Sequence, residues 1–409
     1  MPGLTRPPIE GQIEAVAILF WLLVALGAVW TALFLHGLAE ARRAPRLYPA
    51  APKPGEKLGP VCVLVPARDE EARIGACLRS LLAQDLGEIE IAVIDDRSGD
   101  RTAEIVSGLA AGDSRLRLIR LSAEPPPGWI GKCHALAEGM RLVETGAPWT
   151  LFVDADTVHH PSSISTAVAE AEARGLDMLS LVPHLQAESF WERLVQPAMA
   201  ALIALFHKPS RINDPARPEA FANGQYVLIR TAVYRRIGGH AAVAGKVLED
   251  VELARVVKGA GGRIFLAIGR DLLSTRMYSD LGGLVEGWTK NFYMLMRSQL
   301  SRVTLAALTA LVLSAYPAAC GLLALAALAA GYRPLPVEYL VATAGIYALV
   351  LGFQVTLRAL NRWYPAYALL APVANAVAVY ILLRSAWRHR RGQAVRWKGR
   401  LVRDDGEGG

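Results

Sequence analysis

The stretch WTLFVDADTV, residues 149–158, places an apolar run directly before two carboxylates, Asp154 and Asp156. The run is typical of a buried strand. Side chains two residues apart in a strand share a face, so we expect both carboxylates to point into one site, with Ala155 turned toward the core. Two solvated aspartates in a turn are the ordinary alternative. The pair nevertheless suits a hard divalent cation, which prefers oxygen ligands.

Strand and helix patterns alternate on both sides of this stretch. Short β-rich runs cover residues 61–67, 89–96, 115–121, 149–156 and 177–185. Helical patterns separate them at residues 71–84, 101–111, 131–143 and 162–174. This alternation predicts an α/β fold with a mostly parallel sheet and with ligands at the carboxyl ends of the strands. Residues 224–239 and 259–262 are interpreted as turns around a second, less regular half.

The composition indicates a membrane protein with a soluble middle. Of the 409 residues, 53% are hydrophobic and the mean hydropathy is +0.28, which is too apolar for an ordinary soluble enzyme. The excess is concentrated in four blocks, Ile13–Leu38, Thr304–Gly331, Tyr339–Leu357 and Ala366–Trp387. The first is long enough to cross about 30 Å of hydrocarbon.

The formal net charge of +7 is concentrated beside these blocks. Basic residues follow the first block and crowd the carboxyl-terminal tail, at Arg42, Arg43, Arg46, Lys53 and Lys57, and at Arg388, Arg390, Arg391, Arg396, Lys398 and Arg400. Such clusters are typical of cytoplasmic flanks, and without interleaved aromatic residues they do not indicate a nucleic-acid partner. The four cysteines have no metal-binding spacing, so we interpret them as reduced core residues.

The pattern divides the chain into consecutive regions. We expect a transmembrane helix, a linker, a cytoplasmic catalytic domain, an interfacial amphipathic helix, a distal membrane region and a basic cytoplasmic tail, at residues 1–40, 41–58, 59–283, 284–300, 304–387 and 388–409. The linker is rich in proline, which favours an extended chain between membrane and domain.

Six segments along the chain carry a resemblance to a known family. They are VLVPARDEEARIGACLRSLLAQ, IAVIDDRSGDRTAEI, GWIGKCHALAEG, FVDAD, NGQYVLIRTAVYRRIGGH and VLEDVELAR. In this order they resemble the motifs of family 2 glycosyltransferases of the GT-A fold. The terminal membrane segments and the VRWKGR tail resemble the membrane-bound branch with lipid acceptors, which includes hopanoid-associated and carotenoid-acid glycosyltransferases and, more distantly, ceramide glucosyltransferases. The resemblance implies a sugar-nucleotide donor, Mg²⁺ or Mn²⁺, and transfer of one sugar to a lipid.

The same resemblance implies which residues bind the donor. Asp96 takes the position that binds uracil, and Pro66 and Arg68 would line the base. Here Arg68 and Asp69 stand where Tyr-Asn is frequent, although an arginine plane can still stack on a base. Lys132 lies near a helix start, where a cation can reach a diphosphate. A turn with a helix cap is the alternative for the Asp96 segment, and a solvated lysine is the alternative for Lys132.

The resemblance also implies the metal ligands and the catalytic base. Asp154 and Asp156 would hold the cation on the donor phosphates, and Asp250, the second residue of a Glu-Asp motif with Glu249, would take the proton from the acceptor hydroxyl. Gln225 would help form the acceptor pocket. A helix cap is the ordinary alternative for the Glu-Asp pair, and a structural turn is the alternative around Gln225.

A second departure lies before the distal membrane region. Trp288 matches a Gln/Arg-x-x-Arg-Trp motif of processive or ceramide-type relatives, but Leu284 and Gly287 replace its first and fourth positions. We therefore expect addition of a single sugar. Residues 284–300 form an amphipathic pattern that would lie at the membrane interface.

We interpret the sequence as an inverting, metal-dependent, multi-pass glycosyltransferase of the bacterial inner membrane. We expect a nucleotide sugar, specifically a UDP-sugar, as donor and a lipid hydroxyl as acceptor. A polyprenyl phosphate is the alternative acceptor. A non-catalytic membrane scaffold with a degenerate nucleotide-binding domain is the alternative from another class. A dinucleotide-binding oxidoreductase is disfavoured because the first strand lacks the Gly-x-Gly-x-x-Gly turn.

The positive-inside rule sets a constraint on topology. With a periplasmic amino terminus and a cytoplasmic domain, three distal spans would leave the basic tail outside. We therefore expect one block, Thr304–Gly331, to form a re-entrant pair of helices hinged near Pro317 rather than a span.

Overall fold

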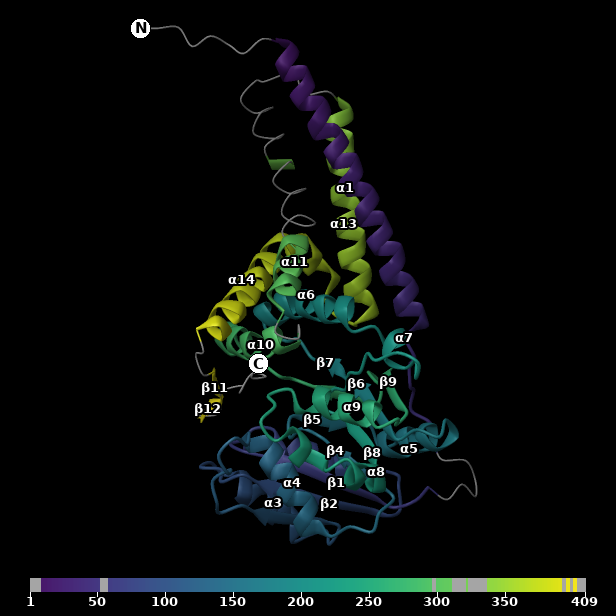
Figure 1. The fold of residues 1–409 in the computed structure, drawn as a ribbon, viewed down its shortest axis with the longest axis vertical. Helices are drawn as coiled ribbons and strands as arrows, with labels where there is room; N and C mark the ends of the chain where they lie inside the picture. Colours follow the sequence, from purple (N-terminus) through teal and green to yellow (C-terminus); the bar gives the residue numbers. More distant parts are fainter. Residues whose placement is uncertain are drawn as a thin grey trace. The chain divides into compact units, whose positions relative to one another are not determined.

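The computed structural model describes residues 9–51, 58–295, 299–310, 321–322, 337–391, 395–397 and 400–402 (Figure 1). It divides the chain into two compact units. The helical unit comprises Met1–Arg42, Ala187–Phe206 and Asp280–Trp387, and the α/β unit comprises Arg43–Gln186, His207–Ser279 and Arg388–Gly409. Each unit is therefore built from segments that are distant in the sequence.

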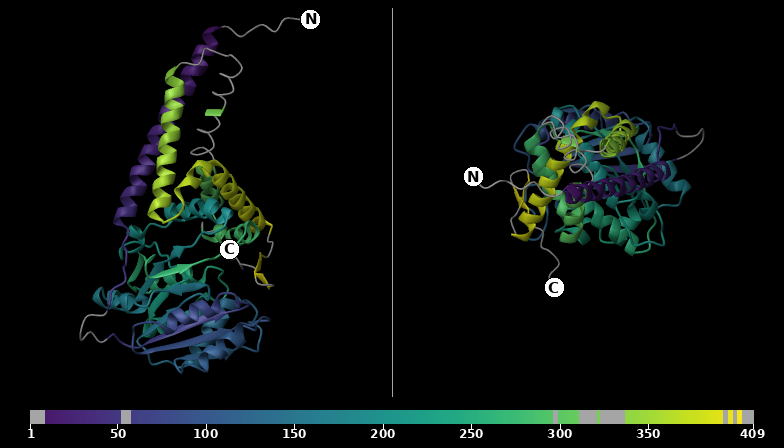
Figure 2. Two further views of the ribbon diagram at one scale, coloured as in Figure 1. Left: turned by 180° about the vertical axis from the view of Figure 1, so that it is seen from behind. Right: turned by 90° about the horizontal axis from the view of Figure 1, so that it is seen from above.

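The helical unit contains seven described helices. They are α1 (Ile9–Arg43), α6 (Phe190–Phe206), α10 (Leu281–Leu295), α11 (Leu300–Ala310), α13 (Val337–Leu360), the 3₁₀ helix η3 (Pro365–Leu370) and α14 (Ala371–Arg390). Helices α1 and α13 run side by side in both ribbon views (Figure 2). The Phe353 ring of α13 lies 5.5 Å from Trp30 and 5.9 Å from Phe34, measured between ring centroids.

Two segments of this unit are long and apolar enough to cross a membrane, Val341–Leu360 and Pro365–Arg388. They coincide with two of the blocks expected from the sequence. Helix α1 covers the first expected block, and its crossing of a membrane stays a prediction. The hinge expected at Pro317 and most of Thr304–Gly331 lie outside the described residues. In the basic tail after Arg391, the described residues form a two-stranded hairpin of β11 (Val395–Trp397) and β12 (Arg400–Val402).

Helix α6 begins with a capping box. The Ser189 hydroxyl accepts a hydrogen bond from the backbone N–H of Glu192 at 3.3 Å, and the Glu192 carboxylate accepts one from the backbone N–H of Ser189 at 2.6 Å. This reciprocal pair satisfies donors that a helix start leaves open. The segment lies inside the single domain 59–283 that the sequence suggested, but the compact α/β unit leaves it out.

Helix α10 bears the expected amphipathic pattern. Its apolar side chains are buried within the helical unit, with Leu284 and Phe292 at 0% and Trp288 at 5% exposure. The Ser385 hydroxyl donates to the carbonyl oxygen of Thr289 at 2.6 Å, which joins α10 to α14. Because protein covers this face, these side chains are not open to lipid, and an interfacial position for the helix stays a prediction.

The α/β unit is built on a seven-stranded sheet in the order β3-β2-β1-β4-β8-β6-β9. Its strands are β1 (Val61–Ala67), β2 (Ile89–Asp95), β3 (Leu116–Arg120), β4 (Trp149–Phe152), β6 (Met178–Val182), β8 (Val227–Arg230) and β9 (Ile264–Ile268). A three-stranded sheet pairs β5 (Thr157–His159), β10 (Leu273–Thr275) and β7 (His184–Leu185). All pairs in the large sheet are parallel except those of β8, which confirms the predicted mixed α/β class with a mostly parallel sheet.

The helices of this unit cover both faces of the large sheet. One core packs α2 (Ile74–Leu82), α3 (Thr102–Ala110) and α5 (Ser163–Ala173) against side chains such as Val63 and Leu151. The other packs α4 (Gly131–Val143), α7 (Pro209–Ile212), α8 (Thr231–Arg236) and α9 (Glu249–Gly259) against side chains such as Leu64 and Ile229. Burial on both faces explains the nearly continuous apolar runs in the strands.

Two expectations about this sheet need correction. The strand predicted to run through residue 156 ends at Phe152, so Asp154 and Asp156 lie in the turn between β4 and β5. The region 224–239 is not only turns, because it contains β8, which pairs with both β4 and β6. A four-residue strand between a turn and a helix is too short to produce a clear alternation in the sequence. A further 3₁₀ helix, η1 (Gly239–Val243), follows α8.

Candidate active site

The loops that follow β1, β2 and β4 leave the same edge of the large sheet. Ala67 pairs with Asp95 across β1 and β2, and Leu64 pairs with Phe152 across β1 and β4. The strands are parallel, so their carboxyl ends meet at one edge. This register brings the predicted donor-binding and metal-binding residues to a common region of the α/β unit.

Hydrogen bonds join the loop after β1 to the loop after β2. Asp69 accepts from the backbone N–H of Gly99 at 2.8 Å, and its own N–H donates to the Ser98 hydroxyl at 3.1 Å. Asp100 accepts from the backbone N–H groups of Glu71 at 2.9 Å and Thr102 at 3.0 Å. We call Asp69, Glu71, Ser98, Asp100 and Thr102 the loop-linking cluster.

The Asp100 carboxylate is stabilised in its ionised form. Burial alone would raise its pKa, but hydrogen bonds from Thr102 and Glu71 outweigh burial and hold the pKa below its ordinary value. Asp69 and Arg97 adopt positive φ angles of 51° and 58°, a conformation that the hydrogen bonds between the loops help to hold. The loop-linking cluster therefore fixes the shape of this end of the site.

Asp96 is 5% exposed and lies between two arginines. Arg97 donates to its Oδ1 atom at 3.1 Å, and the Arg68 Nη1 atom lies 3.9 Å from its Oδ2 atom. Burial raises the pKa of Asp96, and the two arginines counteract part of that increase. Arg68 also donates to the Asp96 carbonyl oxygen at 3.2 Å. The structure thus brings together Arg68 and Asp96, and Pro66 stands beside Ile94 in the same strand pair.

His134 was not assigned a role from the sequence. Its ring is 8% exposed and packs edge-on against Trp129 with 5.9 Å between centroids. The Nδ1 atom of His134 is buried without a hydrogen-bond partner among the described residues. His134 also contributes to the electrostatic environment of Asp96, so this ring belongs to the same end of the site.

Asp154 and Asp156 are neighbours although they do not lie in a strand. The carbonyl oxygen of Asp154 accepts hydrogen bonds from the backbone N–H of Thr157 at 3.3 Å and from its hydroxyl at 2.7 Å, which closes a tight turn. Burial raises the pKa of Asp156 to about 7, and the charge of Asp154 adds to the increase. The Asp156 Oδ1 atom is buried with no hydrogen-bond partner among the described residues.

These two carboxylates fit a divalent cation. A buried carboxylate oxygen without a donor is costly unless a cation compensates for it. No group of three His, Cys, Asp or Glu side chains in the described part of the chain is arranged to hold a metal by itself. A cation here would therefore depend on oxygen atoms from a ligand, as Mg²⁺ does when one or two carboxylates and substrate phosphates bind it.

Lys132, in the first turn of α4, bridges two parts of the site. Its Nζ atom lies 2.6 Å from Asp154 Oδ1 and 2.7 Å from Glu249 Oε1. Burial would lower the pKa of Lys132, but the carboxylates of Asp154, Glu249 and Asp250 hold it well above its ordinary value. The ammonium therefore stays charged, and it links the metal-binding turn to the start of α9.

Asp250 lies beside this lysine. Its Oδ2 atom accepts from the backbone N–H of Gly224 at 2.6 Å, and its Oδ1 atom accepts from the N–H of Val251 at 2.8 Å. Burial, followed by the charge of Glu249, raises the pKa of Asp250 to about 7. A Cβ atom at position 224 would lie 3.0 Å from Asp250 Oδ2 and 3.1 Å from Lys132 Nζ, so this close approach favours glycine there.

We call Lys132, Asp154, Asp156, Glu249 and Asp250 the reactive cluster. It combines two carboxylates whose pKa is raised to about 7 with one half-buried ammonium group. Strongly shifted pKa values of this kind concentrate at functional sites. The arrangement can hold a cation at one end and accept a proton at the other.

The remaining predicted residues are placed differently. Gln225 is 5% exposed, and its side chain donates to the Thr275 hydroxyl of β10 at 3.4 Å, so it supports the fold from within. Trp288 belongs to the helical unit. No sequence motif indicated Tyr278. Burial raises the pKa of Tyr278, and the charge of Asp156 adds to the increase. Only the spatial proximity of the segment after β10 to the β4–β5 turn indicates Tyr278.

The α/β unit is thus a mostly parallel sheet with the reactive cluster on the side of the carboxyl ends of β1, β2 and β4. Residues 59–282 match the family model described as glycosyltransferase like family 2, and the chain belongs to this family. It is accordingly a glycosyltransferase with a GT-A type domain, as the sequence predicted.

Known relatives span most of the chain. A 4,4'-diaponeurosporenoate glycosyltransferase of Staphylococcus aureus (strain USA300) is 25% identical over 346 residues, which are 83% of this chain and 87% of that protein. A protein of the same name from Staphylococcus haemolyticus (strain JCSC1435) is 28% identical over 244 residues, 58% of this chain and 62% of that protein.

Solved structures are also similar. The mannosyltransferase PcManGT from Pyrobaculum calidifontis, in complex with GDP-Man and Mn²⁺, is 18% identical and has a TM-score of 0.49, with 91% of this chain and 99% of that chain covered. Glucosyl-3-phosphoglycerate synthase from Mycobacterium tuberculosis, in complex with Mn²⁺, UDP and phosphoglyceric acid, is 20% identical with a TM-score of 0.40, covering 63% and 87%.

Proposed function

We propose that this glycosyltransferase inverts the anomeric centre as it moves a single sugar from a UDP-sugar to a hydroxyl group of a membrane lipid, with a divalent cation bound at Asp154 and Asp156. The observation that carries the proposal is the reactive cluster, where Lys132 Nζ contacts both Asp154 at 2.6 Å and Glu249 at 2.7 Å. The half-buried Lys132 ammonium therefore links the turn that carries Asp154 to the Glu-Asp motif.

Each residue of the cluster has a separate task. Asp250 accepts the proton of the attacking hydroxyl, and a pKa of about 7 suits a general base at neutral pH. Lys132 provides a positive charge for the departing diphosphate. Asp154 and Asp156 would hold Mg²⁺ or Mn²⁺, which when bound supplies Lewis-acid stabilisation of the leaving group.

Donor binding is assigned to the other end of the site. Asp96 accepts from the base, and Pro66 and Arg68 border it. The loop-linking cluster holds the two loops that carry these residues, through hydrogen bonds of 2.8 to 3.1 Å. A preformed donor site costs less ordering on binding.

The lipid acceptor and the membrane location rest on different observations. Two helical segments are apolar and long enough to span, and the relatives from Staphylococcus carry the name of a long apolar acid, 4,4'-diaponeurosporenoate. We propose a multi-pass protein of the bacterial inner membrane with its α/β unit in the cytoplasm. Gln225 is assigned to the acceptor side of the α/β unit, where it would act through its bond to Thr275. A role for Trp288 in acceptor binding stays a prediction.

The names of these relatives favour a second candidate acceptor, the carboxylate of an apolar acid. The two acceptors differ in their need for a base. A hydroxyl must lose a proton as it attacks, whereas a carboxylic acid with a pKa near 4 to 5 is already ionised at neutral pH. Asp250 would then position the acceptor without taking a proton.

The deciding experiment compares lipid extracts from cells with and without the gene by mass spectrometry, followed by assay of the purified protein with the identified lipid and a panel of nucleotide sugars. The proposal expects a lipid that carries one added hexose, formed only with a divalent cation. Products with long chains of one sugar would contradict single addition, and unchanged lipids together with no nucleotide-sugar turnover would contradict the proposed function.

A further inference from the structure

Strand β9 forms one edge of the large sheet, and other segments make hydrogen bonds to most of its outer side. Asn213 donates to the Leu266 carbonyl oxygen at 3.0 Å and accepts from the Leu266 N–H at 2.7 Å. At the end of β9, the Leu47 N–H donates to the Ile268 carbonyl oxygen at 2.9 Å, and the Ile268 N–H donates to the Pro45 carbonyl oxygen at 2.8 Å. Covering an edge in this way prevents unwanted strand pairing.

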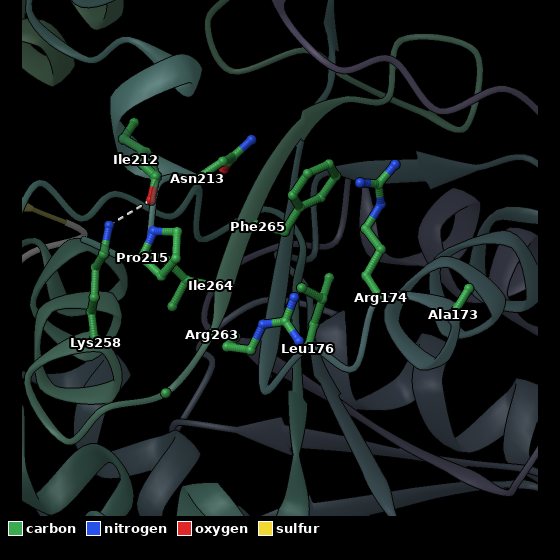
Figure 3. Close-up of a pocket in the computed structure, with 11 residues that line it drawn as sticks. Ala173, Arg174, Leu176, Ile212, Asn213, Pro215, Lys258, Arg263, Ile264 and Phe265 are labelled. Carbon is green, nitrogen blue, oxygen red and sulfur yellow. Dashed lines mark hydrogen bonds between the residues drawn. The ribbon is translucent and has the colours of Figure 1, made fainter. Parts of the chain in front are cut away.

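The beginning of β9 is not covered. Leu266 and Ile268 direct their backbone groups outward, and backbone groups alternate between the two sides of a strand, so Ile264 directs its N–H and C=O to the same free edge. No residue in the described ranges bonds to these two groups outside the sheet. Ile264 lines a cavity of about 330 Å³ (Figure 3), which is within the size range of small-molecule sites.

Three cationic side chains line this cavity, namely Arg174, Lys258 and Arg263, and none of the described lining residues is acidic. Lys258 lies on one side of Ile264 and the Arg263 guanidinium on the other (Figure 3). The guanidinium of Arg263 makes no hydrogen bond or ion pair with any residue that the structure describes. It is therefore available to a ligand.

The other two cations are partly engaged. The Lys258 ammonium donates to the carbonyl oxygens of Ile212 at 2.6 Å and Glu219 at 2.7 Å, so one of its three protons remains. Burial lowers the pKa of Lys258. Arg174 pairs with Glu170 and stacks on the Phe265 ring, with its guanidinium carbon 4.6 Å from the centroid.

We propose that this cavity binds a phosphate-bearing small molecule with an apolar part. Arg263 would grip the phosphate through its planar fork of donors, with the Ile264 N–H and the remaining Lys258 proton as further donors. Leu176, Ile212 and Phe265 form the apolar lining for the rest of the ligand. This chemistry is shared by a soluble phosphate monoester and by a phospholipid headgroup.

The site is distinct from the reactive cluster. Ile264 begins β9, and Leu176 and Arg263 precede the parallel strands β6 and β9, so the cavity lies at the amino ends of strands. The reactive cluster lies at the carboxyl ends of strands. The proposal thus goes beyond the transfer reaction and does not depend on it.

The test uses the full-length protein in detergent and measures binding of 1-naphthyl phosphate by calorimetry. Arg263→Gln should weaken binding at least ~10-fold, because it removes charge-assisted hydrogen bonds to the phosphate. Arg236→Gln is the matched control, since Arg236 is also exposed but lies on α8 outside the cavity. Ala173→Trp, at an exposed lining position, should weaken binding by filling the space without removing a charge.

A second arm distinguishes the sources of the phosphate. The same variants are placed in nanodiscs of phosphatidylcholine with and without phosphatidic acid, and thermal stabilisation by phosphatidic acid is measured. Loss of soluble binding alone in Arg263→Gln supports a soluble ligand, and loss of the lipid effect alone supports a headgroup. If wild type binds neither probe, or if Arg263→Gln behaves as Arg236→Gln does in both arms, the proposal is wrong.

Discussion

Aspartates at one edge of the large sheet fall into two groups with opposite electrostatics. In the loop-linking cluster, Asp100 receives several hydrogen bonds that hold its pKa below the ordinary value. In the reactive cluster, burial raises the pKa of Asp156 and Asp250 to about 7. The same residue type thus has a lowered pKa in one group and raised pKa values in the other. Deeper burial and a neighbouring carboxylate make the difference, because Asp250 also accepts two backbone hydrogen bonds.

Asp96 falls between the two groups. It is buried and has a raised pKa, yet Arg68 and Arg97 lie against it. A carboxylate that two arginines hold in place suits hydrogen bonding to a ligand better than it suits proton transfer. The surroundings of these carboxylates thus differ in three ways, and substitutions can test the proposed task of each.

The largest effect is expected from Asp154→Asn or Asp156→Asn. Loss of the cation removes several kcal/mol of leaving-group stabilisation, so turnover should fall by more than ~10³-fold. Neither variant should unfold, because Asp156 is already costly in its ionised form. EDTA should reproduce the loss in the wild type. If activity stays near normal both with EDTA and in the substituted proteins, the proposed metal dependence is wrong.

Asp250→Asn should lower turnover by ~10²–10⁴-fold with unchanged donor affinity, because a general base acts only on the acceptor proton. Single-turnover rates and equilibrium binding of UDP separate the two quantities. Glu252→Gln is a suitable control, since Glu252 lies in the same helix turn but pairs with Arg255. A variant that loses donor affinity and keeps its turnover would place Asp250 in donor binding instead.

The pH profile should report on the same carboxylate. Only ionised Asp250 accepts a proton, and its pKa is raised to about 7, so turnover should rise ~10-fold per pH unit below 7 and level off above it. Glu249 and Lys132 are the charged neighbours whose substitution would move this midpoint. A flat profile between pH 5.5 and about 8, with an acid as the acceptor, would instead favour the apolar carboxylate.

Lys132→Met should change cation binding before any donor is present. The Lys132 ammonium contacts Asp154 at 2.6 Å, and a like charge about 4 Å away costs up to about 4 kcal/mol at an effective dielectric constant of about 20. Its removal should raise Mn²⁺ affinity at least ~10-fold, while UDP affinity falls. Electron paramagnetic resonance of free Mn²⁺ measures this, and Lys132→Arg should leave the Mn²⁺ affinity low. Equal Mn²⁺ affinity in wild type and Lys132→Met would contradict the expected repulsion between the Lys132 ammonium and the metal ion.

The smallest effect on turnover is expected at Asp100. Asp100→Asn weakens hydrogen bonds to Glu71 and Thr102, which should lower the free energy of unfolding by ~1–2 kcal/mol and leave turnover unchanged where the protein is folded. Because the pKa of Asp100 is lowered, its contribution is present above its unfolded pKa and disappears as the pH falls through the folded value. Denaturation at pH 7 and at about pH 3 checks both statements.

Most of the regular α/β pattern could be predicted from the sequence because strands such as β1, β2 and β4 are buried on both faces. The predicted helix 131–143 matches α4, and the predicted strand 61–67 matches β1. Strand β8 was not predicted, because its pairing with β4 and β6 depends on contacts between segments that are distant in the sequence. Helix α6 has 17 residues, which is short of the ~20 apolar residues of a typical membrane span. The Ser189-x-x-Glu192 capping box is the sequence signal that indicates its start.

The members of the reactive cluster were predicted, but their connection was not. Lys132, Asp154 and Glu249 are far apart in the chain, and no periodicity indicates that the Lys132 ammonium contacts both carboxylates. The role of Tyr278 near Asp156 likewise depends on how the small sheet places the segment after β10. Residue types indicate the chemistry, whereas contacts over long sequence distances set the electrostatics.

The position of β8 has a consequence for synthesis on the ribosome. Strands β1 to β4 emerge first and can pair at once, but the neighbour of β4 on its other side is Val227–Arg230, which emerges much later. At a translation rate of ~5–20 residues per second, β4 presents an open edge for several seconds. Helix α6 is made within this interval, so a nascent chain holds a half-built sheet while an apolar helix is already exposed. Chaperone binding in this interval would protect both surfaces.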